Sequence, residues 1–395
     1  MKLTLKLFLI VFCTTFLQKT FAQNTITFDE SNYETILQKS KAEKKPIFYM
    51  IYATWCPHCN KMKKEVFTDK KVIDFLNSNF VLAQQDGDSL QGKYLKERFN
   101  VTSLPTFVFL DQNETILYKL KGEYSPEQLI SEAKNALNPN TQLPYLEKQF
   151  NEAVSDGNKC LAYLMVLRKG NDRKTLSIPA HNYLNTQQES QLATNLNWTI
   201  IANGVTDIES REFQYVLNHK NDFEAIVGSD RMQRKFVNIV TELLKPYTEN
   251  LDTLQYEKAR KIALMVDIPE TNSLIFNYDL TIAERTENWK KYSESSEKYV
   301  EKLAWDNASL LKEIATNYNK NISDKNSLKK AGKWMERSLE LSDSYDGLLL
   351  ITKLYLKASD KKLATFYGKR AKAKADELSF HNEESDKLFK QLGLK

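Results

Sequence analysis

Two cysteines separated by two residues, Cys56 and Cys59, constrain this chain more than any other feature. Residues 46–53 before them are apolar and rich in side chains that favour strands, which predicts a buried strand. Residues 60–67 after them favour a helix, so the cysteines fall at a strand-to-helix junction. Pro57 suits the first helical turn, where its missing N–H removes no helix bond.

This junction favours redox chemistry. Cys56 is expected at the helix N-terminus, where free N–H groups and the helix dipole favour a negative sulfur. Cys59 follows three residues later on the same helix face. We therefore expect a reversible intramolecular disulfide in which Cys56 attacks and Cys59 resolves.

Residues 1–22 have the pattern of a signal peptide. Lys2 and Lys6 give a basic start, and the apolar run 7–17 is too short for a comfortable membrane span. Small residues near Ala22 suit cleavage there. We expect an exported chain with no stable membrane anchor, located first in the periplasm and otherwise outside the cell.

Removal of the signal peptide would take three lysines and no acidic residue, lowering the net charge from +5 to +2. This charge makes no case for a nucleic-acid partner. The mature chain would keep Cys56, Cys59 and Cys160, and three cysteines cannot form a stabilising disulfide framework. Cys160 lies in an apolar helical run and is interpreted as a buried thiol that packs as a small hydrophobe.

The order of predicted elements indicates an α/β unit followed by a helical region. Residues 138–144 read as a linker, and long amphipathic helical windows dominate residues 145–395. Within the α/β unit, strands are predicted near 46–53, 80–84, 107–110 and 115–120, and helices near 31–43, 60–67, 69–80, 90–99 and 125–137. The last of these opens on a capping box at Ser125 with proline at the first helical position.

Residues 305–395 contain a weak recurrence. Ser323-Asp-Lys325 returns as Ser359-Asp-Lys361, and Gly332-Lys333 returns as Gly368-Lys369, both 36 residues later. This period is typical of helix-hairpin repeats of the tetratricopeptide kind. The alternative, an all-helical region with fortuitous matches, stays open. Five aromatic side chains suit a packed core better than a ligand groove: Trp289, Tyr292, Tyr299, Trp305 and Trp334.

A pair of cysteines at this spacing also occurs in metal and haem sites. Structural zinc normally needs four ligands, and no second pair of cysteines or histidines accompanies this one. Covalent haem needs histidine directly after the second cysteine, where this chain has Asn60. A purely structural disulfide would close a loop too short to stabilise much. We therefore expect no metal and no cofactor.

The residues around the pair identify a resemblance. Trp55 precedes Cys56, and Leu104-Pro105-Thr106 precedes the next predicted strand. With these motifs, residues 24–137 resemble the thioredoxin superfamily, and most closely its exported members with an appended helical region. The resemblance implies a central mixed sheet flanked by helices. It also implies a cis Pro105 that faces the disulfide, with Leu104 and Trp55 in contact with the substrate chain.

The resemblance also implies roles within the motif. Cys56 would be the exposed nucleophile, Cys59 the resolving thiol, and Pro57 part of the catalytic turn. His58 would stabilise the Cys56 thiolate as an imidazolium, and its alternative interpretation is a mere exposed helix residue. Periplasmic oxidases of the DsbA type share Cys-Pro-His-Cys, but they insert their helices inside the fold, so the oxidase assignment is not carried over.

One position departs from the family pattern. Thioredoxins carry a buried aspartate six residues before the first cysteine, and this chain has Met50 there. Cys59 would then rely on water, Glu65 or another base. This predicts slow resolution and long-lived mixed disulfides.

Two functional hypotheses follow. The first is an exported thiol–disulfide oxidoreductase that acts on protein cysteines, with a redox partner protein and a docking partner on the helical region. The second is a protein-binding or chaperone-like module, in which the helical region is the active part and the thioredoxin-like domain is a scaffold.

Overall fold

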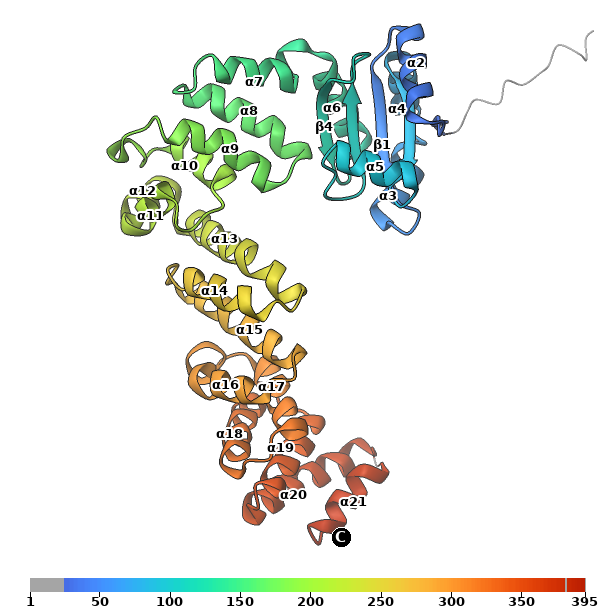
Figure 1. Ribbon diagram of the computed structural model, residues 1–395. Coiled ribbons are helices and arrows are strands. Elements are labelled where there is room, and N and C mark those ends of the chain that lie inside the picture. The colour runs from blue at the N-terminus through green and yellow to red at the C-terminus, as the bar shows by residue number, and fades with distance from the viewer. Residues whose placement is uncertain (1–24, 381, 395) are drawn as a thin grey trace, which may run out of the picture. The chain divides into compact units, whose positions relative to one another are not determined.

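The computed structural model describes residues 25–380 and 382–394 (Figure 1). The predicted signal peptide, residues 1–22, lies outside them. The chain divides into two compact units, one ending at Thr206 and the other beginning at Asp207. Among the described residues, no helix is both long and apolar enough to cross a bilayer.

A four-stranded mixed sheet forms the centre of the first unit. Its strands are β1 (Ile47–Tyr52), β2 (Val81–Asp86), β3 (Thr106–Leu110) and β4 (Ile116–Lys121), in the spatial order β2-β1-β3-β4. β1 pairs in parallel with β2 and antiparallel with β3, and β3 pairs antiparallel with β4. The mixed sheet expected from the sequence is therefore confirmed.

Helices cover both faces of this sheet, as Figure 1 shows. The central strand β1 is buried along its whole length, because its alternate side chains enter two different cores. Phe48 and Met50 pack with α3, α4 and α6, whereas Tyr49 and Ile51 pack with α2 and α5. These helices are α2 (Tyr33–Glu43), α3 (Pro57–Lys61), α4 (Lys70–Asn79), α5 (Leu90–Arg98) and α6 (Pro126–Leu137).

The start of α6 confirms the predicted capping box. The Gln128 amide N–H donates to the Ser125 hydroxyl at 3.2 Å, and the Ser125 N–H donates to the Gln128 side chain at 2.9 Å. Pro126 occupies the first helical turn. This cap fixes the loop between β4 and α6, which carries Glu123 toward the cysteine pair.

The first unit continues past residue 137 with further helices, the first two of which pack on β4. Residues 138–144, expected as a linker, contain a 3-10 helix at Pro139–Thr141 and the start of the next helix. The domain boundaries inferred from the sequence remain a prediction. The added helices are α7 (Leu143–Asn151), α8 (Gly157–Gly170), α9 (Arg173–Leu184) and α10 (Asn195–Gly204), with a 3-10 turn at Glu189–Gln191.

Close packing joins α8 to the edge strand β4. Gly170, the last residue of α8, lies so near Lys119 that an added Cβ would sit 2.5 Å from the lysine backbone. Lys121 donates to the Asn171 carbonyl at 2.6 Å. Lys119 itself is buried, and its ammonium donates to the carbonyls of Phe99 and Asn100 at 2.9 and 3.2 Å. Burial lowers the pKa of Lys119 to about 8.

The described part of the second unit is helical throughout. Its first helices are α11 (Arg211–Asn218), α12 (Lys220–Val227), α13 (Ser229–Glu249), α14 (Thr253–Ala263), α15 (Pro269–Arg285) and α16 (Trp289–Leu303). They are followed by α17 (Ala308–Asn321), α18 (Lys325–Leu341), α19 (Tyr345–Lys357), α20 (Lys361–Leu378) and α21 (Glu383–Gln391).

From α13 to α20 the same capping position recurs every 36 residues. Asp252, Asn288, Asp324 and Asp360 are the N-caps of α14, α16, α18 and α20, and each side chain accepts a backbone N–H of its helix. Three of the four follow a residue with positive φ, namely Leu251, Glu287 and Ser359. In these three cases the preceding helix ends in the same left-handed turn.

The aromatic side chains of this unit belong to its core, as predicted. Tyr292 and Trp334 are buried, and their rings each pack on Tyr318. Trp289, Tyr299 and Trp305 are partly buried against the same core. Tyr299 has a second environment, because it also lines a cavity between α14, α15 and α16.

Candidate active site

Cys56 lies at the turn between β1 and α3, as the sequence predicts. It is the N-cap of α3, with extended backbone angles and Pro57 in the first helical turn. Its sulfur accepts the backbone N–H of Cys59 at 3.4 Å. This N–H of the helix start points toward the Cys56 sulfur, an arrangement that stabilises negative charge there.

The turn before β3 closes over Cys56. The peptide bond between Leu104 and Pro105 is cis, which confirms the expectation drawn from the family resemblance. The Cys56 thiol lies 3.7 Å from the Leu104 carbonyl oxygen and donates to it. The expectation of an exposed Cys56 is wrong: the residue is only 3% exposed, because this turn and the helix start enclose it.

Cys59 is completely buried beneath Cys56. Both cysteines are free thiols. Burial, and then the hydrogen bond with Cys56, raise the pKa of the Cys59 thiol from 9.0 to about 12. A backbone hydrogen bond from Ala53 and the charge of Lys63 act in the opposite direction. The resolving thiol is therefore far harder to ionise than a thiol in water.

Lys63 is the cationic side chain that acts on Cys59. It belongs to a π-helical turn, Met62–Val66, that directly continues α3. Its ammonium lies 3.3 Å from the centre of the Tyr52 ring, at the end of β1. Burial lowers the pKa of Lys63, with opposing contributions from Glu30, Cys59 and Asp86.

The position six residues before Cys56 supplies no base. Met50 is fully buried and shares its core with Cys59. Glu65, named from the sequence as a candidate base, is not among the principal groups acting on the Cys59 thiol. The charged group that the structure brings to this thiol is Lys63, which sequence reasoning did not single out.

His58 projects from α3 toward the loop after β4. Its Nδ1 contacts a carboxylate oxygen of Glu123, and Lys61 binds the other oxygen at 2.6 Å. These bonds, the one from Lys61 first, lower the pKa of Glu123. Because the side chain of His58 is 65% exposed, this cluster lies on the surface beside the cysteine pair.

Trp55 forms an exposed platform next to Cys56. It is 68% exposed, and its indole N–H donates to the Asp88 carboxylate at 2.7 Å. Asp88 lies in the turn after β2, so this bond ties the loop before Cys56 to the end of a neighbouring strand. An exposed indole held in one orientation suits contact with a polypeptide.

The structure thus brings the predicted site residues together around one turn, in three groups: the cysteine pair itself, the cis Leu104–Pro105 turn, and the flanking Trp55 and His58. Two further residues were missed, because they are distant in sequence from their partners: Glu123 and Asp88. The contact of Tyr52, at the end of β1, with Lys63 was also not predicted. Cys160 lies apart in α8, fully buried, and donates to the Pro179 carbonyl at 3.6 Å. This confirms its interpretation as a packed thiol, and burial raises its pKa to about 12.

Known proteins are similar to this chain in the region that contains the cysteine pair. Residues 33–137 match the model of a thioredoxin-like domain. The thiol:disulfide interchange protein DsbD of Yersinia pestis is 32% identical over 100 residues, which are 24% of this chain and 17% of that protein. Protein disulfide-isomerase 1 of Dictyostelium discoideum is 24% identical over 120 residues, 30% of this chain and 32% of that protein. The chain thus covers less than a third of the length of these relatives.

Two solved structures also align with this region. One is a solution structure from Bacteroides thetaiotaomicron, provisionally described as a disulphide-isomerase, with 28% identity over 29% of this chain and 95% of that one, at a TM-score of 0.28. The other is DsbH oxidoreductase, with 23% identity over 31% of this chain and 92% of that one, at a TM-score of 0.26. By its family match and its sheet, the segment 33–137 is a thioredoxin-like domain.

Proposed function

We propose that this chain is an exported thiol–disulfide oxidoreductase that exchanges disulfides with protein cysteines through Cys56 and Cys59. The observation that carries the proposal is the position of Cys56. It lies at a helix N-terminus, with Cys59 N–H at 3.4 Å and the Leu104 carbonyl at 3.7 Å from its sulfur. The names of the relatives matched by this domain support the same chemistry.

The exchange has two steps. The Cys56 thiolate attacks one sulfur of a substrate disulfide, forming a mixed disulfide and releasing the other substrate sulfur as a thiolate. The Cys59 thiolate then attacks the Cys56 sulfur and releases the second substrate thiolate. Two electrons pass from the cysteine pair to the substrate, and the two protons of the pair reach the released sulfurs. A dithiol redox partner protein restores the pair, and the reverse sequence oxidises a substrate.

The surrounding residues have distinct roles in this proposal. The Leu104 backbone and the Trp55 ring hold the substrate chain across Cys56, and Pro105 shapes the turn that faces the sulfur. Pro57 fixes the helix start. His58 contributes positive charge near the Cys56 thiolate, and the carboxylate of Glu123, which contacts His58, reduces the effect of this charge.

Insulin reduction tests this activity. With dithiothreitol as electron donor, the chain should accelerate insulin precipitation, and Cys56→Ser should abolish the acceleration. Cys160→Ser is the matched control, because this buried thiol lies outside the site and its loss should leave the rate unchanged. If Cys56→Ser reduced insulin and other disulfide proteins as fast as the unsubstituted chain, the proposal would be refuted.

Export and location are part of the same proposal. The N-terminal pattern ending near Ala22 supports export, to the periplasm first and otherwise to the cell exterior. An oxidising compartment suits a chain whose close cysteine pair is redox-active. N-terminal sequencing of the chain recovered from its native cells should begin close to Gln23.

For the second unit, which begins at Asp207, we propose helix-pair repeats that dock a partner protein. The support is the 36-residue recurrence of four N-caps, Asp252, Asn288, Asp324 and Asp360. This regularity also favours the second candidate function, a binding module on a redox-inert scaffold. Two separate changes made in cells distinguish the two functions: deletion of residues 207–395, and Cys56→Ser. If the deletion removed the protein's function in the cell and Cys56→Ser did not, the binding module would be favoured.

A further inference from the structure

A groove in the second unit is lined by residues of three consecutive helices, α14, α15 and α16. Its larger part is a cavity of about 730 Å³ lined by polar and charged side chains. A smaller, more apolar cavity of about 290 Å³ adjoins it, because Arg260, Asp279 and Tyr299 line both. Together they are called the α14–α16 groove below.

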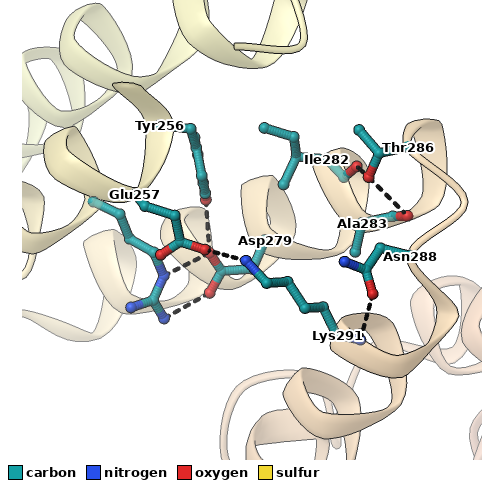
Figure 2. Close-up of polar contacts among 9 residues, drawn as sticks. Tyr256, Glu257, Asp279, Ile282, Ala283, Thr286, Asn288 and Lys291 are labelled. Atoms are coloured by element: carbon teal, nitrogen blue, oxygen red, sulfur yellow. Dashed lines mark hydrogen bonds and ion pairs between the residues drawn. The ribbon is translucent and has the colours of Figure 1, made fainter. Parts of the chain in front are cut away.

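The carboxylate at the centre of this groove is already neutralised. Arg260 donates two hydrogen bonds of 2.6 and 2.7 Å to Asp279. The Tyr256 hydroxyl donates to the same carboxylate at 2.7 Å (Figure 2). The Asp279 bond, followed by its charge, raises the pKa of Arg260 despite partial burial. Asp279 therefore adds little repulsion toward a negative ligand.

A second carboxylate is neutralised in the same way. The Lys291 ammonium donates to Glu257 at 2.6 Å, across the groove from α16 to α14 (Figure 2). Of the carboxylates that line the larger cavity, Glu294 is then the one without an ion-pair partner among the described residues. It lies one turn from Lys291 and from Lys298 on the same helix.

The unpaired charge that remains is mainly positive. Lys298 and Lys302 are exposed, lie one turn apart on α16, and have no carboxylate partner within the described ranges. A hydrogen bond from Lys298 lowers the pKa of Tyr299, and Arg260 adds to this effect. A tyrosine between two cations marks the place where the groove attracts negative charge.

One further feature fits a polypeptide occupant. The smaller part presents an apolar wall from Leu264, Phe276 and Leu303, and Leu264 is 43% exposed. An apolar side chain of a ligand that covers this wall removes apolar surface from water, which favours binding.

From these contacts we infer that the α14–α16 groove binds an extended acidic protein segment, with one apolar side chain beside its carboxylates. The apolar side chain enters the part walled by Leu264 and Phe276, and the carboxylates meet Lys298 and Lys302. The inference names the partner class for the docking role proposed above and rests on that role. It does not depend on the redox activity of Cys56.

Fluorescence anisotropy of a labelled peptide tests this site on the full-length mature chain. The probe is a peptide in which glutamates flank a single leucine. It is compared with two control peptides: one has lysines in place of the glutamates, and the other has serine in place of the leucine. We expect binding of the glutamate–leucine peptide only, weakening as salt rises. The double variant Lys298→Glu, Lys302→Glu should bind it at least about tenfold more weakly, about 1.4 kcal/mol.

Lys290→Glu is the matched control, because this lysine lies on the same helix but outside the groove. It should leave binding unchanged. Equal weakening by the control, equal binding of the lysine peptide, or binding of phosphatidylglycerol vesicles in place of the peptide would overturn the inference. Cys56→Ser should bind the peptide normally, so a failure of the redox proposal and a failure of the groove are distinguishable.

Discussion

Lys63→Met should slow the second step of disulfide exchange. Burial is the largest reason why the pKa of the Cys59 thiol is raised to about 12, and the charge of Lys63 is among the few influences that lower it. Met50 leaves no carboxylate six residues before Cys56 to take the proton. Removing the ammonium therefore raises the pKa of Cys59 further and makes its thiolate rarer at neutral pH.

The size of the effect follows from the helix geometry. Side chains one helical turn apart lie about 6 Å from each other, and unit charges at that distance interact by about 0.7 kcal/mol in water. This corresponds to about threefold less Cys59 thiolate. Since nucleophilicity rises with pKa, the net slowing is about twofold in this aqueous limit and larger at the partly buried position of Lys63.

Stopped-flow mixing of the reduced chain with an aromatic disulfide separates the two steps. The first thionitrobenzoate is released as Cys56 is modified, and the second is released at a concentration-independent rate as Cys59 resolves. Lys64→Met is the control, because Lys64 is exposed and is not among the groups acting on Cys59. An unchanged or faster second phase in Lys63→Met, or resolution in the unsubstituted chain as fast as in a thioredoxin, would refute the reasoning.

Three other changes test separate parts of the structure. Glu123→Gln should make the cysteine pair about twofold to fivefold more oxidising in glutathione buffers, because it removes the carboxylate that neutralises Lys61 and contacts His58 beside the pair. An unchanged equilibrium would contradict this. Gly170→Ala should destabilise the first unit by about 1–3 kcal/mol in urea unfolding, because the added Cβ would clash with Lys119. An increase in stability, as is usual for Gly→Ala in a helix, would contradict the close packing at this position. Cys160 should resist iodoacetamide until the chain unfolds, since it is buried with a pKa of about 12; rapid native labelling would contradict its burial.

The α/β elements could be predicted because they depend on local patterns. The apolar run 46–53 became β1, and the capping box at Ser125 formed as expected. The cis Pro105 followed from the family resemblance. In the helical region, the recurrence seen at residues 323–325 and 359–361 is part of a longer series of N-caps. The earlier members use Asp252 and Asn288 within different sequences, so identity alone did not reveal them.

Features formed by residues distant in sequence could not be predicted. Glu123 reaches His58 from a loop 65 residues away, and Asp88 binds Trp55 from 33 residues away. Only the order of strands in the sheet places these loops beside the cysteine turn. The burial of Cys56 depends on the Leu104 carbonyl lying over its sulfur, which no local pattern encodes.

The redox equilibrium of the Cys56–Cys59 pair tests the central claim most directly. The chain is equilibrated in glutathione buffers of graded ratio, acid-quenched, labelled with a thiol-specific maleimide and analysed by mass spectrometry. We predict one two-electron transition that converts the two labelled thiols into an intramolecular disulfide. It should be absent in Cys56→Ser and unchanged in Cys160→Ser. A pair that stays fully reduced across the whole range, or that forms only separate glutathione adducts, would contradict it.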